Sequence, residues 1–136
     1  MAFLCVDIGG TNTLIGVGNG EFESVKKISS SKFLEDIESH LQDIVKNSKL
    51  EDIDQVAVAA AGPMDREKGV FYPPNIDMSE VDLRTPLSKF GELDIINDCT
   101  AAVLGEKHYG GHGAENLVYV TISSGIGAGI IVDGKL

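Results

Sequence analysis

The chain has 136 residues, a length at which a single domain with one hydrophobic core is the common outcome. Its net charge of −10 and isoelectric point of about 4.6 oppose nucleic-acid binding, because lysine and arginine supply most of the affinity for phosphate backbones. No apolar run approaches the roughly 20 residues of a membrane-spanning helix. The first residues lead directly into an apolar strand and not into a signal peptide. We therefore expect a cytoplasmic protein with no nucleic-acid or membrane partner.

The amino-terminal segment predicts three antiparallel strands. Residues 3–8 form an apolar run of strand length, and residues 13–17 follow after a turn with two adjacent glycines. Asn19-Gly20 is a frequent hairpin turn, so residues 21–28 should return antiparallel as the third strand.

A helix and a buried strand are predicted next. Apolar side chains keep helical spacing over residues 33–45, with acidic residues in the first turn and Lys46 near the end. Residues 55–60 have the composition of a buried strand. Because a crossover connection leads into this strand, it should run parallel to its neighbour.

The second half of the chain predicts a further strand and helix. Residues 93–96 form a short apolar run. Residues 99–107 predict a helix with either Asn97 or Asp98 as its N-cap.

The carboxyl-terminal segment predicts a hairpin. Residues 109–116 form a linker rich in glycine and polar residues. Residues 117–122 and 126–132 predict two strands joined by a small polar turn, a pattern similar to the first hairpin of the chain.

The turn between the first two strands has residues suited to phosphate and metal binding. Gly9 and Gly10 allow backbone N–H groups to approach an anion closely, and Thr11 and Asn12 add polar side chains. Asp7, at the end of a buried strand, could hold a hydrated Mg²⁺ beside the phosphates. A tight hairpin turn would account for the glycines alone. The combination with the acid and the threonine favours a phosphate site.

A second candidate phosphate site lies in the last predicted turn, at Ser123, Ser124 and Gly125. No Gly-Lys-Ser/Thr sequence is present, so neither turn is a Walker A loop. The spacing of Gly125, Gly127 and Gly129 differs from the Gly-x-Gly-x-x-Gly of dinucleotide-binding folds, and a strand and not a helix follows. The serines are therefore interpreted as a second phosphate-binding turn that faces the first.

Two further positions have both a structural and a chemical interpretation. Asp98 follows a buried strand, where an acid either caps the next helix or acts as a general base in phosphoryl transfer. Asn75 lies in a proline-containing loop, where asparagine either forms a turn or offers hydrogen bonds to sugar hydroxyls.

Taken together, these segments resemble a sugar kinase of the ROK family (repressor, open reading frame, kinase), within the actin, Hsp70 and hexokinase superfamily. The resembling motifs occur in the family's order: the first phosphate motif at 7–12, Gly62-Pro63 and the sugar-contacting segment at 72–76, the catalytic segment at 95–106, and the second phosphate motif with its hairpin at 120–136.

The resemblance implies an α/β fold, the actin-like ATPase (ribonuclease H-like) lobe. Its mixed sheet would have three antiparallel strands followed by parallel strands, with flanking helices. Residues 1–115 would form the amino-terminal lobe, and residues 116–136 the first hairpin of a truncated second lobe.

The resemblance also implies an ATP-dependent, glucokinase-like hexose kinase that uses ATP and Mg²⁺. Asp98 would be the general base, Asn75, Asn97 and Asp98 would contact the sugar, and Asp7 would be the metal ligand. N-acetylated amino sugars are substrates that use the same motifs. The implied nucleotide-binding residues are Asp7, Gly9, Gly10, Thr11, Asn12, Ser123, Ser124 and Gly125.

The sequence also departs from the family pattern. Cys99 and Thr100 replace a small residue and an asparagine after the catalytic aspartate, and Ser123-Ser124 replaces Gly-Thr. The family's Glu-Ile-Gly-His segment, zinc-binding residues and adenosine-binding region would follow Leu136. We therefore expect these 136 residues alone to bind sugar weakly at most and to give no useful turnover.

Two alternatives to a kinase stay open: a non-catalytic sugar-binding sensor, and a partner-dependent actin-like module. A homo-oligomer is compatible with either. The family's repressors have an amino-terminal helix-turn-helix, and since the first strand here begins at Phe3, we do not expect a DNA-binding member.

Overall fold

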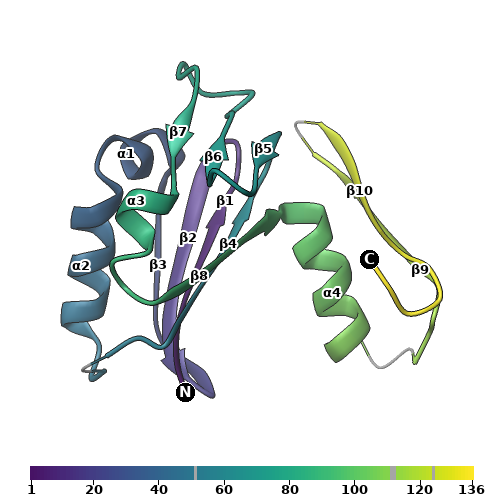
Figure 1. The fold of residues 1–136 in the computed structure, drawn as a ribbon, viewed down its shortest axis with the longest axis horizontal. Helices are drawn as coiled ribbons and strands as arrows, with labels where there is room; N and C mark the ends of the chain where they lie inside the picture. Colours follow the sequence, from purple (N-terminus) through teal and green to yellow (C-terminus); the bar gives the residue numbers. More distant parts are fainter. Residues whose placement is uncertain (51, 111–112, 124) are drawn as a thin grey trace.

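The computed structural model describes residues 1–50, 52–110, 113–123 and 125–136. Its main sheet has five strands in the order β3-β2-β1-β4-β8 (Figure 1). The first three strands are antiparallel, whereas β4 runs parallel to β1 and β8 parallel to β4, as the sequence predicted. The strands are β1 (Ala2–Ile8), β2 (Asn12–Asn19), β3 (Glu21–Ser29), β4 (Gln55–Ala60) and β8 (Glu92–Asn97).

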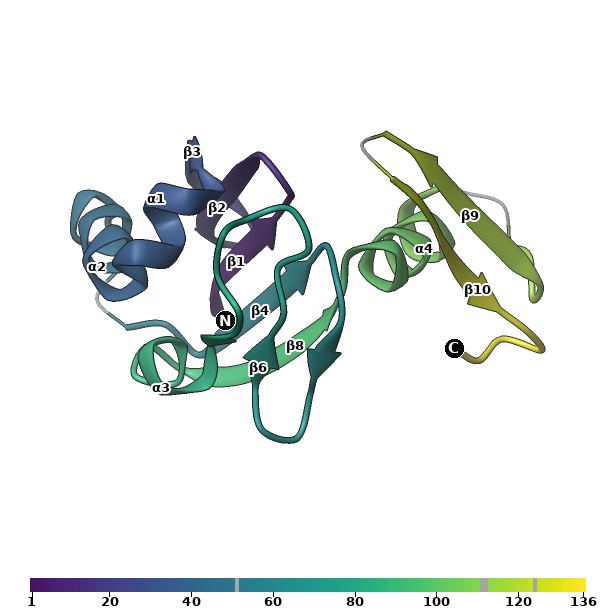
Figure 2. The ribbon, with the colours of Figure 1, turned by 90° about the horizontal axis from the view of Figure 1, so that it is seen from above.

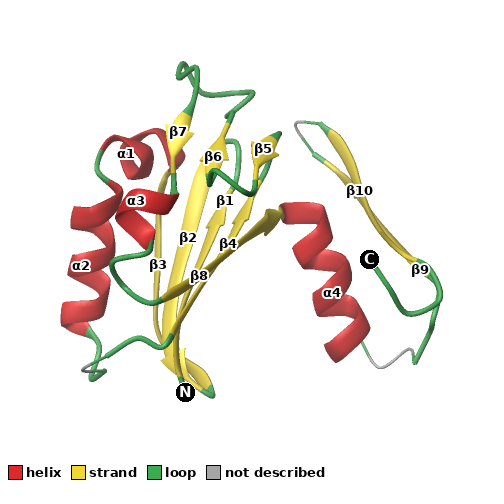
Figure 3. Ribbon diagram, in the orientation of Figure 1, coloured by secondary structure: helices red, strands yellow, loops and turns green. Residues whose placement is uncertain are grey.

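Three helices cover one face of this sheet: α1 (Ser30–Glu35), α2 (Ile37–Asn47) and α3 (Arg84–Leu87) (Figure 3). Alternate residues of β1 and β4 point into the core beneath these helices, because side chains alternate between the two faces of a strand. Leu4 and Val56 are buried there against Phe33 and Leu41. The core therefore lies between the sheet and the helical layer.

The single helix predicted over 33–45 is two helices in the structure. Asp36 leaves the helical conformation, with φ −151° and ψ 72°. Its carboxylate accepts a hydrogen bond of 3.2 Å from the Ser39 N–H, so Asp36 is the N-cap of α2. The apolar spacing continues across the break, which is why periodicity alone did not reveal it.

A small antiparallel sheet, absent from the sequence predictions, is formed by β5 (Met64–Asp65), β6 (Val70–Phe71) and β7 (Val81–Asp82). Arg84 stabilises the β5–β6 turn, because its Nη2 donates to the carbonyl oxygens of Arg66 (2.9 Å) and Glu67 (3.1 Å). Strands of two residues have no detectable periodicity. This sheet supports the loop that contains Asn75.

The remaining elements are α4 (Asp98–Tyr109) and the antiparallel hairpin of β9 (Leu117–Ile122) and β10 (Ile126–Ile131). Seen from above, α4 packs on this hairpin and both lie to one side of the main sheet (Figure 2). Residues 111 and 112 of the predicted linker lie outside the described residues. Among the helices of the described residues, none has the length and apolarity needed to cross a membrane.

Candidate functional site

A cleft of about 520 Å³ lies between the main sheet and the β9–β10 hairpin. Since β1, β4 and β8 are parallel, their carboxyl ends meet at one edge, and the segments that follow them line the cleft. Seven of the predicted site residues line it together: Gly9, Gly10, Asn75, Asn97, Asp98, Ser123 and Gly125.

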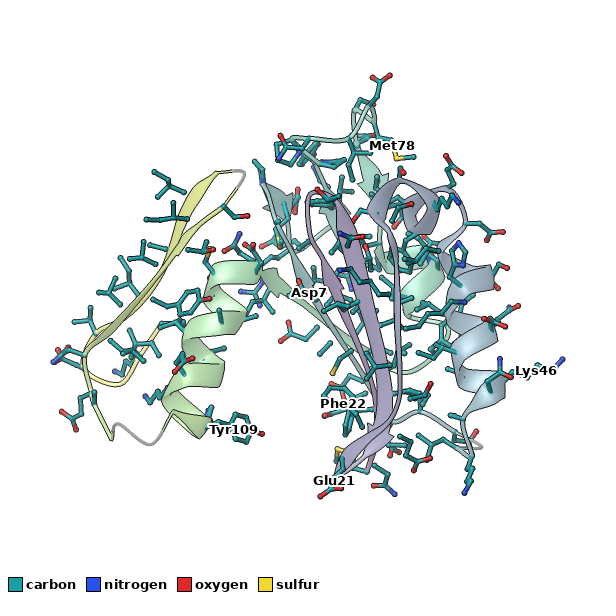
Figure 4. The ribbon with its side chains drawn as sticks, turned by 180° about the vertical axis from the view of Figure 1, so that it is seen from behind. Asp7, Glu21, Phe22, Lys46, Met78 and Tyr109 are labelled. Carbon is teal, nitrogen blue, oxygen red and sulfur yellow. The ribbon has the colours of Figure 1, made fainter. Side chains whose placement is uncertain are left out.

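Three of the other predicted site residues lie outside the cleft. Thr11 and Asn12 are exposed and do not line the cleft. Asp7 borders a neighbouring apolar hollow of about 370 Å³, on the side of the sheet that faces α4 (Figure 4). Ser124 lies outside the described residues.

A larger hollow of about 710 Å³ is lined by acidic residues of the α1–α2 segment and of residues 77–82. It contains none of the predicted site residues. The cleft, and not this larger hollow, is therefore the candidate site.

Asn97 and Asp98 have different roles at the start of α4. The Asn97 Oδ1 accepts hydrogen bonds from the N–H groups of Cys99 (3.0 Å) and Thr100 (3.4 Å), which makes Asn97 the N-cap. Asp98 is the first residue of the helix, and its Oδ1 also accepts from the Cys99 N–H at 2.9 Å. The helix does not depend on Asp98 for its cap.

The environment of the Cys99 thiol, beside Asp98, disfavours its ionisation. Burial raises the pKa of the Cys99 thiol, and the charge of Asp98 and a hydrogen bond to it raise that pKa further. The reactive form of cysteine is the thiolate. The Cys99 thiol is therefore disfavoured as a nucleophile at this position.

The Asp7 carboxylate is partly desolvated and lies in the field of Asp98. Burial raises the pKa of Asp7, and the negative charge of Asp98 raises it further. A cation between the two carboxylates would relieve their repulsion. Mg²⁺ commonly binds through one or two carboxylates together with substrate phosphates and water. The described residues hold no group of three or more His, Cys, Asp or Glu side chains suited to bind a metal ion alone.

Ser30 anchors the glycine turn, and sequence reasoning missed it. Its Oγ donates to the Gly9 carbonyl at 2.6 Å, and its N–H donates to the Thr11 carbonyl at 2.9 Å. The Ser30 and Thr13 hydroxyls are buried and lie 3.0 Å apart. Within the turn, the Gly9 N–H donates to the Asn12 carbonyl at 3.0 Å. The only sequence signal was a serine at the expected start of a helix.

Comparison with known proteins supports the assignment of the fold. The model of the ROK family matches residues 3–136. The glucokinase of Streptomyces coelicolor is 33% identical over 138 residues, which cover 96% of this chain and 44% of that protein. The structure of a ROK family glucokinase from Streptomyces griseus, in complex with glucose and AMPPNP, has a TM-score of 0.80 at 30% identity, covering 99% of this chain and 46% of its own.

A relative of another functional class is also similar. The xylose repressor of Bacillus subtilis is 27% identical over 84 residues, which cover 60% of this chain and 22% of that protein. The chain spans less than half the length of each of these relatives. Because the family model matches nearly every residue, the chain belongs to the ROK family.

Proposed function

We propose that the cleft is the amino-terminal part of the active site of an ATP-dependent, glucokinase-like hexose kinase. One observation carries this proposal: Asn75, Asn97 and Asp98 line the same cleft as Gly9 and Gly10 of the first turn and Ser123 and Gly125 of the second. A volume of about 520 Å³ is within the usual range for small-molecule sites. The glucokinases among the relatives supply the substrate class.

Asp98 would act as the general base. Its carboxylate accepts the proton of a sugar hydroxyl while the hydroxyl oxygen bonds to the γ-phosphorus of ATP, and the bond from that phosphorus to the β–γ bridging oxygen breaks to release ADP. Asn75 and Asn97 would orient the sugar. The capping bonds use the Asn97 Oδ1 only, and no hydrogen bond from its Nδ2 is formed within the described residues.

The two turns would hold the phosphates of ATP. On the cleft, Gly10 offers its backbone N–H group, and across from it Ser123 offers its hydroxyl and Gly125 its backbone N–H. The N–H groups of Gly9 and Ser123 donate within their own turns, to the carbonyls of Asn12 (3.0 Å) and Gly125 (2.8 Å). Thr11 and Asn12 would add their polar side chains at the edge of the first turn. Asp7 is the residue that would hold Mg²⁺, which neutralises phosphate charge when it is bound. The adjoining Ser124 belongs to the proposed set by its place in the sequence.

In this proposal, residues 1–115 form the amino-terminal lobe and residues 116–136 the first hairpin of the second lobe. The chain matches 44% of the S. coelicolor glucokinase, so much of the corresponding cleft in that protein comes from further residues. We therefore expect the 136 residues alone to bind sugar weakly and not to turn it over. Hexose phosphorylation by these residues alone would contradict that expectation.

Sugar binding is tested by titrating the ¹⁵N-labelled chain with D-glucose, D-mannose and N-acetylmannosamine. The expected result is a change in the amide resonances of Asn75, Asn97 and Asp98 with at least one of the three sugars. The variant Asp52→Asn is a control and should give the same resonance changes as the parent chain. Asp52 is exposed and precedes the opposite, amino-terminal end of β4. Resonance changes confined to other parts of the molecule, or none with any sugar, would contradict sugar binding in the cleft.

A second candidate is a non-catalytic sugar sensor, favoured by the similarity to the xylose repressor. The replacement Asp98→Asn distinguishes the two in a protein that has the complete cleft. A kinase would lose turnover and keep sugar binding, whereas a sensor would show no turnover to lose.

A partner-dependent actin-like module is favoured by a different observation. The face of the β9–β10 hairpin opposite α4 exposes six large apolar side chains by 53–81% of their surface: Val118, Val120, Ile122, Ile126, Ile130 and Val132. Such a face is uncommon on an isolated domain. Sedimentation analysis of the chain distinguishes a monomer from an assembly.

A further inference from the structure

The loop that carries Asn75 rests on two glycines that are far apart in the sequence. A Cβ placed on Gly10 would lie 3.3 Å from the Asn75 Nδ2 and 3.8 Å from the Asn75 Cβ. A Cβ placed on Gly62 would lie 2.7 Å from the Pro74 Cδ and 3.1 Å from the Tyr72 carbonyl oxygen. The β1–β2 turn, at Gly10, and the segment that follows β4, at Gly62, therefore both lie against this loop.

The Asn75 side chain lies close to the backbone of Gly10. Asn75 is exposed, and within the described residues its amide forms no hydrogen bond. The loop backbone is fixed on one side by the Tyr72 N–H, which donates to the Pro63 carbonyl at 3.0 Å. The Gly10 backbone therefore limits how far the Asn75 amide can move toward the first turn.

The backbone conformation does not explain why residue 10 is glycine. Gly62 has φ +157°, whereas Gly10 is not among the glycines of positive φ in the part of the chain that the structure describes. A residue with a side chain could adopt the Gly10 backbone conformation. The nearest obstacle to such a side chain is the amide of Asn75.

We propose that the backbones of Gly10 and Gly62 form the surface on which the Asn75 loop rests, and that they position Asn75 for sugar binding. Gly10 is then a positioning residue for the sugar as well as part of the phosphate turn. This inference rests on the proposed sugar-binding function of the cleft. Gly10 would act through Asn75: a methyl group at position 10 would lie 3.3 Å from the Asn75 Nδ2, so the amide must shift by a few tenths of an ångström. The same residue then links the sugar subsite with the turn proposed for phosphate.

Gly10→Ala tests whether Gly10 positions the Asn75 side chain, with Gly105→Ala as its matched control. A Cβ on Gly105 meets no atom within 4 Å, so the control adds the same methyl group without contact. In the ligand-free ¹⁵N-labelled chain, the side-chain NH₂ resonances of Asn75 should move in Gly10→Ala and stay in place in Gly105→Ala. Unmoved Asn75 resonances in Gly10→Ala would overturn the proposal.

Titrations with D-glucose and with Mg·ADP then separate the two subsites. We expect Gly10→Ala to weaken D-glucose binding about tenfold, the value of one good hydrogen bond, and to change Mg·ADP binding less. Equal weakening of both ligands with unmoved Asn75 resonances would assign Gly10 to the phosphate turn alone. If the parent chain binds no D-glucose, the proposed function fails for that sugar, while the Asn75 resonances still decide whether Gly10 positions the side chain.

Pro74→Ala provides a second variant without added volume. It removes the Cδ that lies over Gly62, so the loop loses a contact and no clash is introduced. The expected result is weaker D-glucose binding with an otherwise unchanged amide spectrum. Unchanged D-glucose affinity in Pro74→Ala would contradict the part assigned to Gly62.

Discussion

The carbonyl group of Cys99 lies directly against the backbone of Gly129, with no room for a Cβ between them. At Gly127, two residues earlier in β10, a Cβ would lie only 2.6 Å from the Cys99 Sγ. The first turn of α4 therefore packs on β10 where β10 has glycines and no side chain of its own. Figure 2 shows the two elements side by side. This contact places the first turn of α4, which begins with Asp98, against the β9–β10 hairpin.

Gly129→Ala should destabilise the chain by about 1–3 kcal/mol, the usual cost of adding volume to a packed contact. The added methyl group would overlap the Cys99 carbonyl and approach the Val103 side chain to 2.8 Å. Urea unfolding followed by circular dichroism measures the change. Gly105→Ala, in α4 itself, is the control and should be neutral or stabilising, because alanine favours a helix over glycine. Equal stability of the two variants would argue against close packing at Gly129.

Asp7→Asn should stabilise the chain at neutral pH and have less effect in acid. The pKa of Asp7 is raised in the folded state, so the folded state binds this proton more tightly than the unfolded state does. The ionised carboxylate therefore costs stability above the raised pKa. That cost disappears below the ordinary aspartate pKa of about 3.9.

Thermal unfolding of Asp7→Asn at about pH 7 and about pH 3 tests the sign of this effect. The midpoint should rise relative to the parent chain at the higher pH, and the difference should shrink at the lower pH. Asp52→Asn controls for the loss of one negative charge. A midpoint that falls at neutral pH would contradict the desolvation assigned to Asp7.

Ser30→Ala should loosen the glycine turn. It removes the 2.6 Å hydrogen bond to the Gly9 carbonyl and leaves the buried Thr13 hydroxyl without this partner. An unsatisfied buried polar group costs about 1–3 kcal/mol. Ser31→Ala is the matched control, because Ser31 is the next residue and is exposed. Urea unfolding should separate the two variants, and similar midpoints would show that Ser30 contributes little.

Replacements of Asn97 separate its capping role from its proposed sugar contact. Asn97→Ala removes the cap of α4 and should cost about 1 kcal/mol. Asn97→Ser keeps a good capping oxygen but removes the amide donors. We expect Asn97→Ser to retain the stability of the parent chain and to bind D-glucose more weakly. Undiminished D-glucose binding in Asn97→Ser would exclude the sugar contact.

The sequence predicted the elements whose hydrophobic pattern extends over enough consecutive residues to be recognised without tertiary contacts. The runs that became β1 and β9 alternate or stay apolar over six or more residues, and the hairpin turn at Asn19-Gly20 has a strong local signal. The parallel arrangement of β4 followed from the crossover that precedes it.

One of the features that were missed is a local side-chain cap, and the others depend on contacts between residues distant in the sequence. Asp36 ends a helix because its side chain caps the next one, although the apolar spacing continues. Ser30 binds the Gly9 carbonyl across 21 positions of sequence, and Gly10 lies beneath Asn75. A sequence shows which residues could bind a ligand, but such contacts appear only when the fold brings the segments together.

The proposed function depends above all on Asp98 as the general base of a sugar kinase. The direct test fuses residues 1–136 to the remaining carboxyl-terminal part of the S. coelicolor glucokinase and measures ATP-dependent phosphorylation of D-glucose. We expect turnover, with Asp98→Asn lowering kcat by about a hundredfold or more and leaving the KM for D-glucose within a few-fold. A fused protein that binds D-glucose without phosphorylating it, or one whose kcat survives Asp98→Asn, would contradict the claim.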